Sequence, residues 1–78
     1  MREKKLYLVI SFPTTSAAMA MEAMCTKNNL PGRLIPVPHE ITAGCGMALR
    51  AEVEEEQSLL AAAKEADIQV EGVYKLVI

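Results

Sequence analysis

The sequence predicts a two-layer α+β fold, in which two helices cover one face of a four-stranded antiparallel sheet. Apolar segments of strand length alternate with helix-forming segments in the order β-α-β-β-α-β. The chain has 78 residues, of which 51% are hydrophobic. This length and apolar content suffice for one hydrophobic core but not for two, because a chain of this length buries only about 60% of the surface that its unfolded form exposes. We therefore expect a single domain over residues 1–78.

Two strands and one helix are expected in the first half of the chain. The segment KKLYLVISF is rich in β-branched and aromatic residues and predicts a buried strand over residues 5–12. The hydroxyl residues of PTTS can cap a helix, which is expected from about Thr15 to Asn28. After the break NNLPG, the segment RLIPV predicts a short second strand. Its proline suits an edge position or the end of the strand, because proline cannot donate a hydrogen bond to a central ladder.

The second half of the chain repeats this pattern. MALRAEV alternates and predicts a third strand with one buried face (Leu49) and one more polar face (Ala48, Arg50). EEEQSLLAAAKEA predicts a second helix whose acidic first turn suits the positive end of the helix dipole, and VYKLVI predicts the last strand. Right-handed crossovers then favour a ferredoxin-like sandwich, with a mixed α/β unit of different strand order as the main alternative.

Composition excludes several classes of function. The formal net charge is −2 and only three residues are aromatic, which argues against a nucleic-acid partner. No segment approaches the roughly 20 apolar residues of a membrane span, so we expect no membrane partner. Two cysteines and one histidine fall short of the four ligands of a structural zinc, so we expect no metal and no cofactor. This cysteine usage indicates free thiols in a reducing, cytoplasmic compartment.

The segment PHEITAGCG (38–46) is a long connection that contains the chain's only histidine and a cysteine between two glycines. In the expected topology this connection shares one edge of the sheet with the start of the first helix. A helix N-terminus favours negative charge, so we expect the thiol of Cys45 to have a pKa below the ordinary value of about 8.5. Alternatively, Gly44 and Gly46 only satisfy turn geometry and Cys45 is a half-buried filler.

Other side chains have candidate roles, each with a structural alternative. His39 is a base or ion partner for Cys45, or a solvated loop residue. Arg33 and Arg50 bind an anionic ligand or face water, and the PTTS hydroxyls cap the helix or bind an anion. The predicted site therefore has Cys45 and His39 as catalytic residues and the following ligand-binding residues: Thr14, Thr15, Ser16, Gly44, Gly46 and Arg50.

Cys25 is expected to belong to the core. It lies on the apolar stripe of the first helix, where a free cysteine behaves as a small hydrophobe. It also lies some ten residues into that helix, roughly 15 Å from its start at a rise of 1.5 Å per residue. A disulfide between Cys25 and Cys45 is therefore not expected, because the two Cα atoms must approach within about 7 Å.

The chain resembles a family of small bacterial proteins described as "putative Se/S carrier protein-like". The resemblance covers about residues 5 to 77 and rests on YLVISFPTTSAAMAMEAMC, LPGRLIPVPHEITAGCGMALR and the late GVYKLV. It implies that Cys45 carries selenium or sulfur as a perselenide or persulfide. The family usually has arginine where this chain has His39. If that arginine helps to hold an anionic chalcogen, this chain would hold it differently, or only when His39 is protonated. The chain lacks the C-P-x-P motif of better understood sulfur-relay carriers.

Two functions follow from these observations. As a carrier, Cys45 accepts sulfur or selenium from a donor enzyme and passes it to an acceptor enzyme, so the chain is a co-substrate more than an enzyme. As the alternative, the chain is a non-catalytic ferredoxin-like interaction or small-ligand-binding module, dimeric through its last strand, in which Cys45 is incidental. A thiol redox sensor is less favoured, because no resolving cysteine lies nearby.

Overall fold

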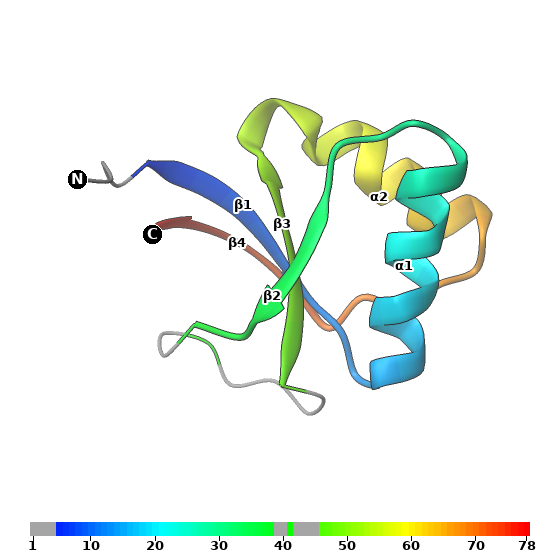
Figure 1. Cartoon of the computed structure of the whole chain (residues 1–78), viewed down its shortest axis with the longest axis horizontal. Helices are drawn as coiled ribbons and strands as arrows, with labels where there is room; N and C mark the ends of the chain where they lie inside the picture. Colours follow the sequence, from blue (N-terminus) through cyan, green and yellow to red (C-terminus); the bar gives the residue numbers. More distant parts are fainter. Residues whose placement is uncertain (1–4, 39–40, 42–45) are drawn as a thin grey trace.

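A computed structural model describes residues 5–38, 41 and 46–78 of the chain (Figure 1). It confirms the α+β class and the predicted order of elements. The second helix differs slightly from the prediction, because Val53 begins a short 3-10 helix instead of ending the third strand. In chain order the elements are β1 (Leu6–Ser11), α1 (Thr15–Lys27), β2 (Arg33–Pro36), β3 (Met47–Glu52), η1 (Val53–Glu55), α2 (Glu56–Glu65) and β4 (Gly72–Val77).

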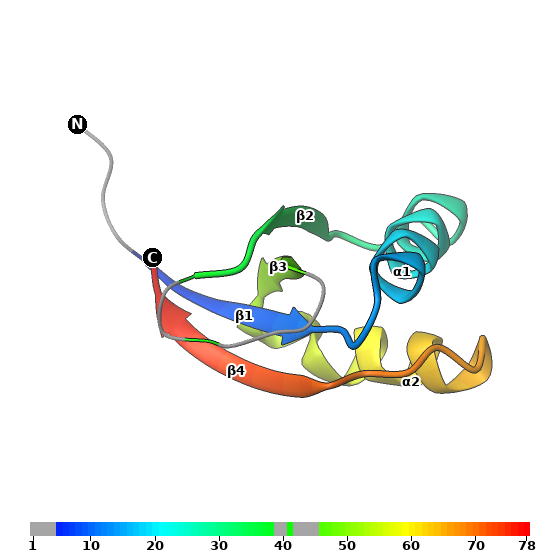
Figure 2. The ribbon, with the colours of Figure 1, turned by 90° about the horizontal axis from the view of Figure 1, so that it is seen from below.

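The four strands form one sheet in the order β2-β3-β1-β4, and every neighbouring pair is antiparallel. Both helices lie on the same side of this sheet (Figures 1 and 2). This is the predicted ferredoxin-like arrangement, and it excludes the mixed α/β alternative. The β1–β4 ladder extends beyond the strand ends, because the backbone N–H of Ile78 donates to the carbonyl of Lys5 at 3.1 Å.

The register places three chain segments at one end of the sheet. Ser11, the last residue of β1, lies opposite Ala48 near the start of β3. Pro36, the last residue of β2, lies opposite Met47. Three strand ends therefore lie at the same end of the sheet, as the sequence predicted: the end of β1, the end of β2 and the start of β3. Helix α1 begins four residues after Ser11.

The main core fills the space between the sheet and the helices. On α1 the buried residues recur at spacings of three and four, which places them on the face that contacts the sheet. On β1 every second residue points to the same layer. The buried members of this core are Leu8, Ile10, Phe12, Ala18, Met21, Cys25, Leu49, Ala51, Leu59 and Ala63.

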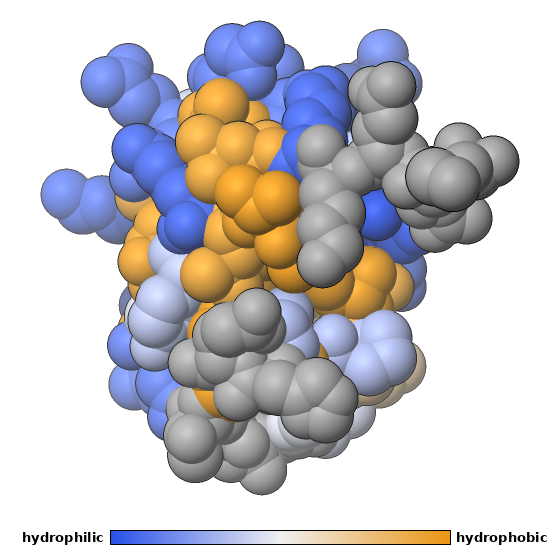
Figure 3. All heavy atoms as spheres, turned by 90° about the vertical axis from the view of Figure 1, so that its left-hand side faces the viewer, coloured by the Kyte–Doolittle hydropathy of each residue, from blue (hydrophilic) through white to orange (hydrophobic). Residues whose placement is uncertain are grey.

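A second, smaller apolar cluster lies on the other face of the sheet. Apolar side chains gather on this side, away from the helices (Figure 3). The sequence predicted a more polar face here, and the prediction is wrong for Ala48, which is fully buried. Ile41 packs in the same cluster as Ala48 and is only 5% exposed. Its N–H donates a hydrogen bond to the Pro38 carbonyl at 3.0 Å. The cluster comprises Val9, Ile41 and Ala48, flanked by Ile35, Val37, Leu76 and Ile78.

Candidate functional site

Of the predicted site residues, Gly46 lies at the end of the sheet just described, which we call the Gly46 end and define by Ser11, Pro36 and Gly46. Gly46 is exposed, and its carbonyl accepts a hydrogen bond from the N–H of Val37 at 3.0 Å. Its φ is +74°, a backbone conformation that favours glycine over other residues. Of the other predicted residues in this segment, His39, Gly44 and Cys45 lie outside the described residues.

The start of α1 follows the Gly46 end in the chain, four residues after Ser11, and carries hydroxyl groups. Thr14 is the N-cap, and its Oγ1 accepts a hydrogen bond from the N–H of Ala17 at 3.1 Å. Thr15 and Ser16 follow in the exposed first turn. No acidic side chain occupies that turn, so the positive end of the helix dipole is not neutralised there by a carboxylate of the helix itself. This terminus can therefore stabilise an anion.

Ser11 is a polar residue at the same end that the sequence interpretation did not single out. It is fully buried and belongs to the sheet face that also carries Val9, away from the helices. Its Oγ has no hydrogen-bond partner among the residues that the structure describes. Such buried unpaired hydroxyls are uncommon in folded proteins. The signal in the sequence was a serine inside the otherwise apolar run YLVISF.

Cys25 lies in the core, as predicted. Its side chain is 1% exposed and forms no disulfide. Burial, with a smaller contribution from the nearby carboxylate of Glu22, raises the pKa of the Cys25 thiol. A buried thiol with a raised pKa is a poor nucleophile, because the thiolate is the reactive form.

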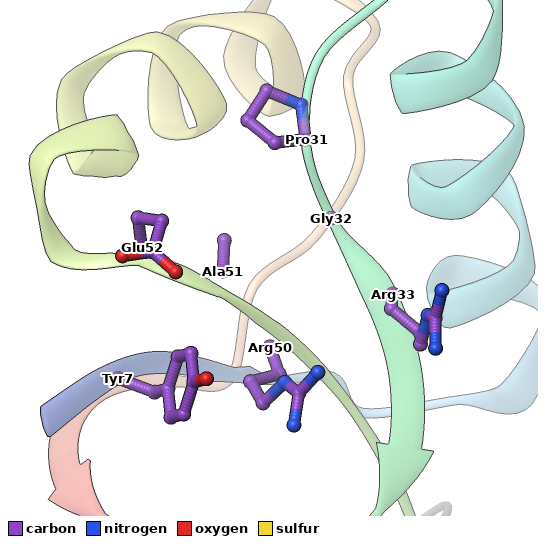
Figure 4. Close-up of a pocket in the computed structure, with 7 residues that line it drawn as sticks. All are labelled: Tyr7, Pro31, Gly32, Arg33, Arg50, Ala51 and Glu52. Carbon is purple, nitrogen blue, oxygen red and sulfur yellow. The ribbon is translucent and has the colours of Figure 1, made fainter. Parts of the chain in front are cut away.

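Arg50 lies away from the other predicted ligand-binding residues. It is four residues beyond Gly46 on β3, a separation of about 13 Å at 3.3 Å per residue. Its guanidinium carbon lies 4.6 Å from the centroid of the Tyr7 ring, at the opposite end of the sheet. There it lines an open pocket of about 300 Å³ (Figure 4). The structure thus separates Arg50 from the Gly46 end.

Within residues 5–38, 41 and 46–78, no group of three or more histidine, cysteine, aspartate or glutamate residues is arranged to hold a metal ion. Neither helix of these residues has the length and apolar character that crossing a membrane requires.

The chain is similar to one protein family over most of its length. The chain matches no curated protein and no solved structure at a significant level. The family model matches residues 7–75, which includes both helices, the segment 38–46 and all or part of every strand. The chain therefore belongs to the family described as "Putative Se/S carrier protein-like".

Proposed function

We propose that this chain is a selenium or sulfur carrier, in which Cys45 holds a perselenide or persulfide and relays it between enzymes. The observation that carries the proposal is the burial of Cys25 in a chain that has only two cysteines and belongs to a Se/S carrier-like family. Carrying a chalcogen atom requires a thiolate that another protein can reach. Cys25 does not meet this requirement, so the role falls on Cys45.

The surroundings of the sheet edge support this assignment. Gly46, the residue after Cys45 in the sequence, lies at the edge from which α1 begins. The first turn of α1 contains hydroxyl groups and no carboxylate. A helix N-terminus of this kind stabilises thiolates and other anions. We expect Thr15 and Ser16 to contribute there, while Thr14 keeps its role as the N-cap.

The transfer step is a thiol–persulfide exchange. The Cys45 thiolate attacks the outer sulfur of a persulfide on the donor enzyme, and a bond forms between the Cys45 Sγ and that sulfur. The sulfur–sulfur bond of the donor breaks, and the donor cysteine leaves as a thiolate. No external oxidant or reductant is consumed. The same attack on a perselenide transfers selenium, and a second exchange delivers the atom to an acceptor enzyme.

His39 and the glycines have supporting roles in this proposal. A protonated His39 would stabilise the Cys45 thiolate, in place of the arginine that the family usually has at this position. Gly44 and Gly46 keep the turn free of side chains that would shield the sulfur. We further propose that the protein works in the reducing cytoplasm, where a single thiol stays free for exchange.

The test compares the two cysteines directly. Single variants Cys25→Ser and Cys45→Ser are alkylated with iodoacetamide over a range of pH values, and each protein is then incubated with a persulfide donor. We expect the Cys25→Ser protein to react with an apparent pKa below about 8.5 and to gain the mass of one sulfur atom. We expect the folded Cys45→Ser protein to react slowly and to gain no mass.

The opposite pattern would contradict the proposal. An ordinary thiol pKa for Cys45, together with no mass gain in the Cys25→Ser protein, removes the carrier function. Unfolding both variants in urea provides the control, because both thiols should then be alkylated at equal rates.

The exposure of β4 favours a second candidate function, a dimeric interaction module. Val73, Tyr74 and Val77 are 37%, 37% and 55% exposed, and β4 has β1 as its only neighbour among the described strands. An apolar edge strand of this kind can pair with a second copy. Light scattering during size-exclusion chromatography distinguishes the candidates. A stable dimer that the variant Tyr74→Lys dissociates supports the module, and a monomer at all concentrations contradicts it.

A further inference from the structure

An open pocket lies at the end of the sheet opposite Gly46. It has a volume of about 300 Å³, within the range of small-ligand sites. The starts of β1 and β2 and the end of β3 form its walls (Figure 4). The lining residues are Tyr7, Pro31, Gly32, Arg33, Arg50, Ala51 and Glu52.

Arg50 is held in position on the wall of this pocket. Its side chain is half-buried, and its guanidinium carbon lies 4.6 Å from the centre of the Tyr7 ring. Figure 4 shows the guanidinium beside this ring. A cation placed over an aromatic ring is attracted by the ring's quadrupole, and the contact limits the rotamers that the arginine samples. The N–H donors of the Arg50 guanidinium group are therefore already oriented to bind a planar or tetrahedral oxyanion.

Arg33 brings a second positive charge to the same pocket. The register of β2 and β3 pairs Arg33 directly with Arg50. Opposed residues of an antiparallel pair have Cβ atoms about 5 Å apart, and like charges at such positions destabilise the sheet. In the view of Figure 4 the two guanidinium groups lie on opposite sides of the β2 ribbon. Arg33 is exposed, so its side chain is free to turn towards the pocket.

The one carboxylate in the pocket does not neutralise these arginines. Glu52 forms an ion pair with Lys5, and this hydrogen bond is the main reason that the pKa of Lys5 is raised. Within the described ranges, neither Arg33 nor Arg50 has an ion-pair partner. The pocket thus carries two uncompensated positive charges on adjacent strands of a chain whose formal net charge is −2.

We propose that this pocket binds a small, doubly charged oxyanion of the phosphate class. One pair of its oxygens accepts hydrogen bonds from the fork of Arg50, and another oxygen accepts from Arg33 after this side chain turns inward. The negative charge of the anion compensates the repulsion that arises when the two guanidinium groups approach each other. The site is about 13 Å along β3 from Gly46, so its occupancy does not depend on the chemistry of Cys45.

The test is a titration of the isotope-labelled full-length protein with inorganic phosphate, followed by amide chemical shifts in NMR spectra. Sodium chloride keeps the ionic strength constant, because exposed charges are screened by salt. We expect saturable shifts confined to the starts of β1 and β2 and the end of β3. Acetate, which carries one charge, should bind at least about tenfold more weakly.

Variants separate this site from nonspecific attraction. Arg50→Gln and Arg33→Gln should each weaken phosphate binding by at least about tenfold. Lys64→Gln, which removes an exposed positive charge from the last turn of α2, should leave it unchanged within about twofold. Equal loss in all three variants, shifts that do not saturate, or acetate binding as tightly as phosphate would overturn the proposal.

Thermal unfolding gives a second readout. In low-salt buffer without multivalent anions, Arg33→Gln should raise Tm or leave it unchanged, because it removes a like-charge pair. In phosphate buffer the Tm of the wild-type protein should rise, because a ligand that binds only the folded state stabilises that state. The Tm of the variant should rise less. A variant whose Tm falls in low salt and rises as much as wild type in phosphate would contradict the proposed site.

Discussion

The sulfur of Cys25 lies 3.1 Å from the position that a Cβ atom on Gly32 would occupy. Both Cδ atoms of Leu49 lie 3.3 Å from the same position. Cys25 and Leu49 are buried in the core, so a shift of either side chain would disturb its packing. The start of β2 is therefore in direct contact with α1 and β3, and a glycine is needed there because of this close approach.

Replacing Gly32 with alanine should lower the free energy of unfolding by about 1–3 kcal/mol, as expected for overpacking of a dense core. Urea denaturation measures the change. In a Cys25→Ala background the penalty should be smaller, because the sulfur is gone and only the Leu49 contact remains. An equal penalty in both backgrounds would show that the contact with Cys25 is not the cause.

Stability should decrease in alkaline solution through Cys25. Its pKa is raised in the folded state by burial, so the folded protein favours the neutral thiol. This contribution is fully present below the unfolded-state pKa of about 8.5 and is lost as the pH rises through the folded-state pKa. Between the two pKa values the free energy of unfolding should fall with pH, with a slope of at most about 1.4 kcal/mol per pH unit. Urea midpoints between pH 7 and about pH 10 measure it.

The matched control for this pH dependence is Cys25→Ala. The variant retains every other titrating group, so the difference between the two pH profiles isolates Cys25. Parallel profiles for the two proteins would contradict the prediction.

Replacing Thr14 with alanine should destabilise the protein by about 1 kcal/mol. The substitution removes the acceptor of the hydrogen bond from the N–H of Ala17 and leaves that group to water. Thr15→Ala is the control, because it removes a neighbouring exposed hydroxyl that does not cap the helix. Equal changes in Tm for the two variants would argue against a specific role of the cap. Thr14→Ser should keep most of the wild-type stability, because serine retains the hydroxyl that caps the helix.

Replacing Gly46 with alanine should cost about 1–2 kcal/mol through backbone strain alone. The residue has a φ of +74°, and a Cβ atom there would meet no described atom within 4 Å. Gly46→Asn should cost less, because asparagine tolerates left-handed conformations better than alanine. Calorimetric unfolding of both variants tests this order. A larger loss for asparagine would indicate a steric cause instead of a conformational one.

The fold could be predicted from the sequence because local patterns and topology rules agree. The alternation in MALRAEV, the spacing of Ala18, Met21 and Cys25, and the prolines near β2 each specify one element. Right-handed crossovers then leave few ways to close the sheet. The buried position of Ala48 could not be predicted in this way, because its cluster includes Ile41, a residue from a connection with no periodic pattern.

The candidate site was predictable only in part. The sequence indicated which segments share the Gly46 end, because strand directions fix which ends meet. It placed Arg50 in the same ligand-binding set as Gly46, whereas the structure separates the two residues by about 13 Å along β3. The stacking of Arg50 on Tyr7 joins residues 43 positions apart in the sequence and depends on the β1–β3 register. That register has no local signature.

The pairing of β1 with β4 has a consequence for folding kinetics. β1 lies inside the sheet, yet its second neighbour is formed by residues 72–77, and the hydrogen bond from Ile78 to Lys5 closes almost the whole length of the chain. During synthesis β1 therefore has one unpaired side until residues 72–77 have emerged. Contacts of such long sequence separation slow the folding of small domains, so assembly of the sheet should be rate-limiting, with the helices formed earlier.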